Sequence, residues 1–180
     1  MTPAEERASY EANVQSILRA IAIRPVGFNT FWPRGTPRTL EVLQDLGFLY
    51  HIDDVSRDEP FVVPVRDKPF VVVPYTIGMN DIVLFEERHF SADRLASELR
   101  LEFDQLYAEA EGRRRMMSIS THDRITGRPA RARVLEEFIA HAQQRPGVVF
   151  LRKDEIARFA LESPLTPREG ALAEVSMSGR

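Results

Sequence analysis

The sequence lacks cysteine, and this absence excludes both a disulfide framework and a metal site built on thiolates. It also lacks any apolar run that approaches the roughly 20 residues of a membrane-spanning helix. The opening residues are polar and acidic, without the basic segment and the apolar stretch of a signal peptide. These absences predict a cytoplasmic protein that makes no contact with a membrane.

An excess of positive charge is missing as well. The chain has 24 Lys and Arg residues against 27 Asp and Glu residues, for a formal net charge of −3 at pH 7. The run of three arginines at 113–115 is short and isolated, whereas a nucleic-acid-binding domain usually has a broad basic face. We therefore expect no nucleic-acid partner. Hydrophobic residues are abundant, at 43% of 180 residues, which suits one domain with a substantial core.

Helical patterns alternate with short apolar runs along the chain. Amphipathic spacing and capping residues predict helices, and apolar runs next to Gly and Pro predict strands. Thr2 and Glu5 have the spacing of a capping box at the start of the first helix, and Thr36 is the expected N-cap of the second helix. A turn is expected at residues 66–68, and Pro64 is expected on an edge strand. The predicted helices are 2–21, 36–47, 91–112, 128–147 and 152–162, and the predicted strands are 24–31, 48–52, 61–65, 69–75, 115–121 and 148–151.

This alternating order predicts an α/β fold with mainly parallel strands that are buried on both faces. One domain is expected over residues 1–162. A poorly ordered tail is expected over residues 163–180, which are rich in Pro, Ser and Gly.

Polar and charged side chains gather where the predicted strands end. In folds with parallel strands, ligands bind at the carboxyl ends of the strands, so these loops form a candidate active-site face. The candidate residues in the four loops are Trp32 and Arg34; Asp53 and Asp54; Asn80 and Asp81; and His122, Asp123 and Arg124.

Each of these groups allows a chemical and a structural interpretation. His122 either transfers protons, with Asp123 orienting it, or only satisfies a neighbouring polar group. Arg124 either binds a planar carboxylate or ureide, or is a solvated residue before a helix. Asp53 and Asp54 either act together near His51 or form an Asp-rich turn, and the turn is favoured.

Three stretches carry a resemblance to a known family. They are "RPVGFNTFWPRGTPRTLEVLQDLGFLYHIDD", "FVVVPYTIGMND" and "MMSISTHDRITGRPARARVLEEFIAHAQQRPGVVFLRKDEIARFAL". Together they resemble the NodB-homology, or polysaccharide deacetylase, family, and most closely its cytoplasmic allantoinase-like branch. The "LxxLGFLY" unit and the histidine before "GRP" are the most specific parts.

The resemblance implies a (β/α) barrel and hydrolysis of non-peptide carbon–nitrogen bonds in a small amide, cyclic ureide or imide, with a role in carbohydrate metabolism for many members. It implies that His122 is a general acid for the leaving group. It places Arg34 near an arginine that holds a catalytic aspartate, although Asn29 lies closer to the usual place. In metal-dependent members, one Asp and two His hold a divalent ion such as zinc.

The chain departs from the family at its first two motifs. It has neither Thr-Phe-Asp-Asp-Gly nor a His-x-x-x-His pair, and its four histidines are His51, His89, His122 and His141. It therefore resembles the C-terminal portion of a barrel whose first strands are missing, either because it starts at an internal Met or because its gene is truncated.

Four expectations follow from this departure. The chain alone is inactive, it binds no stoichiometric zinc, and a metal belongs only to a full-length form. Because strands 24–28 and 147–151 would be unpaired edges, the chain is expected to form a homo-oligomer or to need a partner. The alternative to a hydrolase is a non-catalytic remnant or a partner module.

Overall fold

The structure is a computed structural model, and it describes residues 2–30 and 35–169. The chain divides into two compact units. The first, here called the sheet unit, comprises Met1–Pro74 with Leu151–Arg180. The second, called the helical unit, comprises Tyr75–Phe150.

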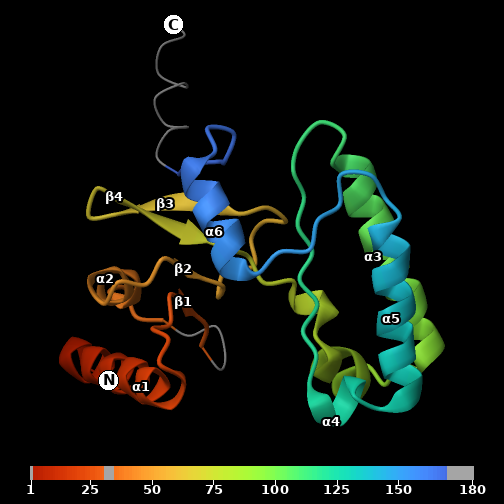
Figure 1. Cartoon of the computed structure of the whole chain (residues 1–180), viewed down its shortest axis with the longest axis horizontal. Helices are drawn as coiled ribbons and strands as arrows, with labels where there is room; N and C mark the ends of the chain where they lie inside the picture. The colour runs from red at the N-terminus through yellow and green to blue at the C-terminus, as the bar shows by residue number, and fades with distance from the viewer. Residues whose placement is uncertain (1, 31–34, 170–180) are drawn as a thin grey trace, which may run out of the picture. The chain divides into compact units, whose positions relative to one another are not determined.

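Four strands form the sheet of the first unit, in the order β1-β2-β4-β3 (Figure 1). Their pairing is parallel between β1 and β2, parallel between β2 and β4, and antiparallel between β4 and β3. The predicted α/β fold with mainly parallel strands is confirmed, and Pro64 lies on an end strand as expected. The strands are β1 (Gly27–Phe28), β2 (Tyr50–His51), β3 (Phe61–Val65) and β4 (Lys68–Val72).

The turn between β3 and β4 uses two left-handed residues, Arg66 with φ of 46° and Asp67 with φ of 62°. Two positive φ values give the turn the twist that neighbouring antiparallel strands require. The Arg66 guanidinium also forms ion pairs with Glu41 and Asp45, both at 2.9 Å. These contacts attach the tip of the hairpin to the second helix.

Within its described residues, the sheet unit has three helices. Helix α1 (Pro3–Ile21) begins with the predicted capping box of Thr2 and Glu5. Helix α2 (Thr39–Asp45) begins later than predicted, with Arg38 at its N-cap; the Thr36 hydroxyl accepts the Arg38 N–H at 3.2 Å and donates to the Glu6 carboxylate at 2.8 Å. Helix α6 (Lys153–Glu162) packs against β3 and β4.

A buried carboxylate joins α1 to the start of α2. Glu6 is 2% exposed, and its oxygens accept hydrogen bonds from the hydroxyl groups of Thr39, Thr36 and Tyr10. Burial raises the pKa of Glu6, but the three hydroxyl donors outweigh burial and bring it below the ordinary value of 4.5. Burial and the bond to Glu6 raise the pKa of Tyr10 to about 12. All the hydroxyl groups of this network are used inside the unit.

The outer edge of β3 is covered by residues near the end of the described chain. Val62 forms a parallel bridge with Arg168. The Val62 N–H donates to the Pro167 carbonyl at 2.9 Å, and the Glu169 N–H donates to the Val62 carbonyl at 2.8 Å. Residues 163–169 of the expected tail therefore follow a defined course, and residues 170–180 lie outside the described part.

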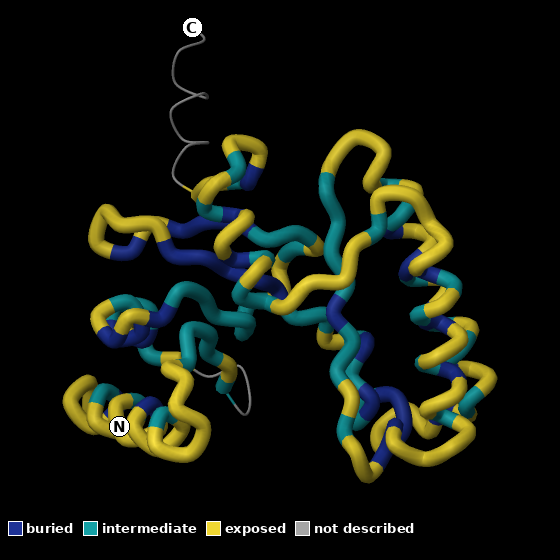
Figure 2. Tube along the Cα trace, in the orientation of Figure 1, coloured by how far each residue is buried: buried dark blue, intermediate teal, exposed yellow. Residues whose placement is uncertain are grey.

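The helical unit has one apolar core between its two long helices, α3 (Ala92–Glu109) and α5 (Pro129–Gln143) (Figures 1 and 2). Both helices confirm sequence predictions. The shorter elements are η1 (Ile77–Met79), the π-helix η2 (Ile82–Glu87) and α4 (Asp123–Thr126). The core side chains are Met79, Leu84, Phe85, Phe90, Leu95, Leu99, Phe103, Ile125, Val134, Phe138 and Ala142.

Two predicted strands are wrong. Residues 115–121 form no strand, although Ser120 makes a single parallel bridge with Asn80. Residues 148–151 are also irregular, and the exposed fractions of Val149, Phe150 and Leu151 are 71%, 55% and 49%. Apolar runs of this kind form strands only where a neighbouring strand pairs with them, and the described residues provide none here.

The strand predicted at 24–31 is reduced to Gly27–Phe28 within its described part. Among the described helices, none has the length and apolar character needed to cross a lipid bilayer.

Candidate active site

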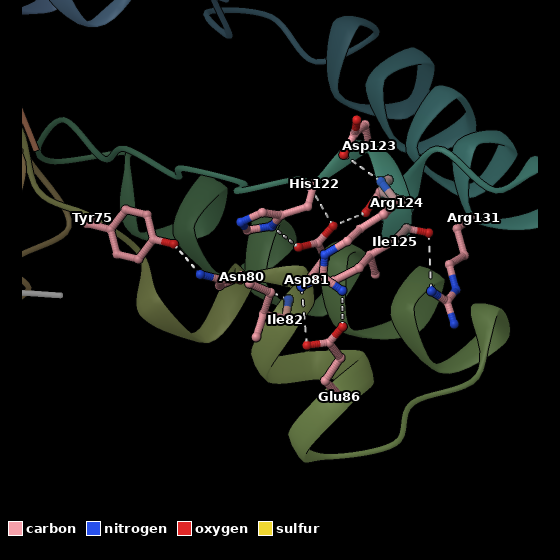
Figure 3. Close-up of polar contacts among 11 residues, drawn as sticks. Tyr75, Asn80, Asp81, Ile82, Glu86, His122, Asp123, Arg124, Ile125 and Arg131 are labelled. Atoms are coloured by element: carbon pink, nitrogen blue, oxygen red, sulfur yellow. Dashed lines mark hydrogen bonds and ion pairs between the residues drawn. The ribbon is translucent and has the colours of Figure 1, made fainter. Parts of the chain in front are cut away.

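The helical unit contains an aspartate–histidine pair (Figure 3). The Oδ1 atom of Asp81 lies 2.6 Å from Nδ1 of His122. Asp81 is 3% exposed, whereas the side chain of His122 is 41% exposed. The carboxylate therefore holds one ring nitrogen from the inside, and the imidazole reaches the surface.

Backbone hydrogen bonds bring the two residues together. The Ser120 N–H donates to the Met79 carbonyl, and the Asp81 N–H donates to the Ser120 carbonyl, both at 3.0 Å. These bonds place the segment before His122 alongside the segment before Asp81. Within the predicted strand 115–121, Ser120 forms a bridge with Asn80, and this bridge lies next to the site.

The other carboxylate oxygen has two donors. Oδ2 of Asp81 accepts the backbone N–H of His122 at 2.7 Å and the hydroxyl of Thr126 at 2.6 Å. Burial raises the pKa of Asp81, but these bonds and the His122 ring outweigh it, so that the pKa lies below the ordinary value of 3.8. Asp81 is therefore ionised at neutral pH, and an ionised carboxylate can only accept a hydrogen bond, so Nδ1 of His122 carries the hydrogen of this contact.

His122 is one of the residues that line a groove of about 640 Å³. Residues from α4 and α5 line this groove, among them Thr126, Leu135 and Ile139. With Nδ1 occupied by Asp81, the other ring nitrogen, Nε2, is the one left for a reacting group. The arrangement can give a proton to, or take one from, a molecule beside His122.

Asp123 does not orient His122, contrary to the sequence prediction. It is exposed, and its Oδ1 accepts the backbone N–H of Arg124 at 2.7 Å. The orienting carboxylate is Asp81, a candidate residue of another strand-end loop, for which the sequence predicts binding of the substrate. Both oxygens of Asp81 are used and buried, so that it acts on His122 rather than on a bound molecule.

Arg124 lies next to the pair and is exposed. Its guanidinium forms an ion pair with Glu86 of η2, and this contact raises the pKa of Arg124. Asn80 is occupied on both sides, because its Nδ2 donates to the Tyr75 hydroxyl at 2.6 Å and its Oδ1 accepts the Ile82 N–H at 2.9 Å. Of these predicted substrate contacts, only Arg124 has a charged group at the surface.

The remaining predicted residues belong to the sheet unit. Oδ1 of Asp53 accepts hydrogen bonds from Asn29 Nδ2 and from the Thr30 N–H, both at 2.9 Å, which ties the ends of β1 and β2 together. Asp54 accepts the Ser56 N–H at 2.7 Å and so forms the turn that the sequence favoured. Trp32 and Arg34 lie outside the described residues.

His51 is oriented by its neighbours in the sheet unit. Its Nδ1 accepts the Asp53 N–H at 3.4 Å, and its ring stacks on Phe70. Burial lowers the pKa of His51, so that the ring is neutral at neutral pH.

Sequence reasoning did not identify Thr126 and Glu86 as parts of the site. Thr126 lies four residues after His122, and a short helix between them would have placed its hydroxyl near the histidine. Nothing in the sequence indicated the pairing of Glu86 with Arg124, because it depends on how η2 and α4 meet.

The residues present do not fit the divalent metal that the resemblance implies. Within residues 2–30 and 35–169, no three His, Asp or Glu side chains converge in a way that could hold an ion. Structural and catalytic zinc sites need three or four protein ligands.

The chain was compared with known proteins. No family model matches it. A putative polysaccharide deacetylase of Schizosaccharomyces pombe is 30% identical over 173 residues, a match that covers 87% of this chain and 54% of that protein. The chain therefore spans about half the length of the curated relative.

Solved structures agree with this result. A probable polysaccharide deacetylase from Pseudomonas aeruginosa PAO1 has a TM-score of 0.81 and 35% identity, over 91% of this chain and 56% of that one. The structure of Puue allantoinase gives a TM-score of 0.81 and 34% identity, over 92% and 56%. A third, from Mycobacterium smegmatis, is 23% identical with a TM-score of 0.77 and supports the fold alone. The predicted resemblance is confirmed over part of the relatives' length.

Proposed function

Because this chain matches part of the polysaccharide deacetylase (NodB-like) family, we propose that it carries the proton-transfer half of a hydrolase that cleaves non-peptide carbon–nitrogen bonds. The observation that carries the proposal is the short contact between buried Asp81 and the exposed ring of His122. The substrate is a small amide, cyclic ureide or imide, and the fold of the longer protein is a (β/α) barrel.

His122 acts as the general acid. When water adds to the carbonyl carbon of the substrate and the C–N bond breaks, the leaving nitrogen takes the proton from Nε2. The Asp81 carboxylate stabilises the doubly protonated ring before this step, and after it the neutral ring keeps its Nδ1–H hydrogen-bonded to Asp81. Proton transfer of this kind typically contributes about 10²–10⁴-fold to the rate.

The groups that would activate the water are not among the described residues. Asp53 and Asp54 are engaged in bonds within the sheet unit, and Asp81 is committed to His122. These three carboxylates are therefore not available as the base that activates the water. Arg124 is the proposed contact for a carboxylate or ureide oxygen, once it exchanges Glu86 for the substrate.

A second candidate is a non-catalytic module that functions only in an assembly. The exposure of Val149, Phe150 and Leu151 favours this alternative, because such apolar side chains gain free energy when another surface covers them. The two candidates differ in whether His122 has any effect on turnover.

The experiment uses the chain alone and a chimera. In the chimera, this chain replaces the matched region of the Pseudomonas aeruginosa relative. Turnover of allantoin, a cyclic imide and an N-acetylated oligosaccharide is measured for both proteins. We expect no turnover by the chain alone, and turnover by the chimera that falls about 10²–10⁴-fold in His122→Asn and in Asp81→Asn.

Asp123→Asn is the matched control, since Asp123 is adjacent to His122 but lies exposed and bonded to Arg124. It is expected to change turnover less than about threefold, because exposed substitutions away from the reacting atoms have small effects. A folded chimera whose activity does not respond to His122→Asn would contradict the assignment and favour the non-catalytic module.

A further inference from the structure

We propose that Thr126 is a positioning residue for His122: its hydroxyl fixes the Asp81 carboxylate in the one orientation that leaves Nε2 as the reacting nitrogen. This inference rests on the proposed function of His122. The Thr126 hydroxyl is bonded to Asp81, and its effect would pass through that carboxylate.

Thr126 is held in place by its own backbone and by burial. Its N–H donates to the His122 carbonyl at 2.9 Å, which closes the first turn of α4. The residue is 5% exposed, and a β-branched side chain has few χ1 rotamers in a helix. Its hydroxyl donates to Oδ2 of Asp81 at 2.6 Å, at the point where Asp81 meets His122.

The carboxylate of Asp81 needs such a constraint. The terminal torsion of an aspartate is broad, so that a single hydrogen bond does not define the plane of the carboxylate. Two donors converge on Oδ2, the His122 N–H at 2.7 Å and the Thr126 hydroxyl at 2.6 Å. With Oδ2 fixed by both, Oδ1 faces Nδ1 of His122 at 2.6 Å.

Gly127 allows this arrangement. A Cβ atom at Gly127 would lie 2.2 Å from the Asp123 carbonyl oxygen, closer than any real side chain is found. The tight end of α4 thus requires a glycine immediately after Thr126. The motif from His122 to Gly127 is therefore a compact unit whose His122 N–H and Thr126 hydroxyl both donate to Asp81.

A hydroxyl that only satisfied a buried polar atom would contribute to stability and leave the histidine unchanged. A positioning hydroxyl also sets which ring nitrogen of His122 carries the proton. The two roles are separated by the tautomer of the ring, which ¹⁵N NMR of histidine-labelled protein reports without any turnover.

The full chain is labelled with ¹⁵N-histidine, and His122→Asn assigns the His122 signals among the four histidines. In the wild-type chain and in Thr126→Ser, we expect the neutral ring to be protonated predominantly on Nδ1. In Thr126→Val, which removes the hydroxyl at nearly constant volume, we expect a loss of this preference and a shift of the Asp81 carboxyl titration to higher pH. Thr126→Ala is the second variant in case the valine chain does not fold.

The inference is overturned if Thr126→Val or Thr126→Ala folds and keeps the wild-type ring signals of His122. It is also overturned if Thr126→Ser behaves like the valine variant, because the hydroxyl would then not be the cause. Failure of the proposed function would look different. An inactive chimera in which His122 keeps its tautomer preference would contradict the proposed reaction, but it would not contradict the positioning role of Thr126.

Discussion

Each unit of the molecule contains one buried carboxylate with three hydrogen-bond donors, and the two carboxylates serve different purposes. Glu6 of the sheet unit is 2% exposed and accepts three hydroxyl groups. Asp81 of the helical unit is 3% exposed and accepts a backbone N–H, a hydroxyl and an imidazole.

The two carboxylates differ in the kind and the location of their hydrogen-bond partners. The partners of Glu6 are side chains of its own helix and of the start of α2, so that the network is closed and fastens two helices. One partner of Asp81 is His122, whose ring reaches the surface. A buried carboxylate that orients a histidine is expected at a functional site, whereas one that is bonded only to hydroxyl groups of neighbouring helices is expected to be a structural joint.

The largest expected effect is on stability. Glu6→Gln and Asp81→Asn each leave buried donors without an ionised acceptor, and each is expected to lower the free energy of unfolding by about 2–3 kcal/mol. Only Asp81→Asn should also change the ¹⁵N signals of the His122 ring. Denaturant unfolding and NMR of the same samples test both parts.

Glu86→Gln is the control, since it removes an exposed carboxylate that also has a cationic partner. It is expected to cost less than about 1 kcal/mol. If Glu6→Gln perturbed the His122 signals as strongly as Asp81→Asn does, the distinction between the two carboxylates would be lost.

Acid should act on both units in a smaller and graded way. The folded-state pKa values of Glu6 and Asp81 lie below their ordinary values of 4.5 and 3.8, so the unfolded chain binds protons first as the pH falls. The stability that the two carboxylates provide is complete above these ordinary values, and it is lost as the pH falls through the folded values.

Unfolding curves at neutral pH and at pH 3.8 measure this loss. Glu6→Gln removes one of the two contributions, so its stability should depend less on pH than that of the wild-type chain in the interval below 4.5. An equal dependence in both proteins would mean that Glu6 has an ordinary pKa when folded.

The smallest expected effect concerns the outer edge of β3. Glu169→Pro removes the N–H that donates to the Val62 carbonyl, whereas Glu169→Ala keeps it and loses only the ion pair with Arg57. An uncovered strand edge recruits other chains, so the proline variant should show more self-association in light scattering than the alanine variant. Equal scattering by both variants would mean that residues 167–169 do not protect the edge.

Local patterns in the sequence predicted local structure well. The capping box at Thr2, the hairpin around Arg66 and the helix that begins at Pro129 all depend on residues within a few positions of one another. His122 was recognised because it follows an apolar run and precedes a Gly and a Pro. Signals of this kind do not require knowledge of the fold.

Pairings between distant residues could not be predicted in the same way. Asp81 and His122 are 41 positions apart, and Asp123 was assigned the orienting role only because it is adjacent in the sequence. The runs at 115–121 and 148–151 have the composition of buried strands, yet a strand exists only where another strand pairs with it. The identity of the orienting carboxylate and the extent of the sheet therefore depended on tertiary contacts.

Because Val62 pairs with Arg168, the edge of β3 is covered only after nearly the whole chain has been synthesised. The entire helical unit, Tyr75–Phe150, is synthesised between β3 and the segment that covers its edge. At roughly 5–20 residues per second, the helical unit has emerged a few seconds before residue 169. During that interval the sheet has an open side on the nascent chain, and a chaperone or another strand has its best opportunity to bind there.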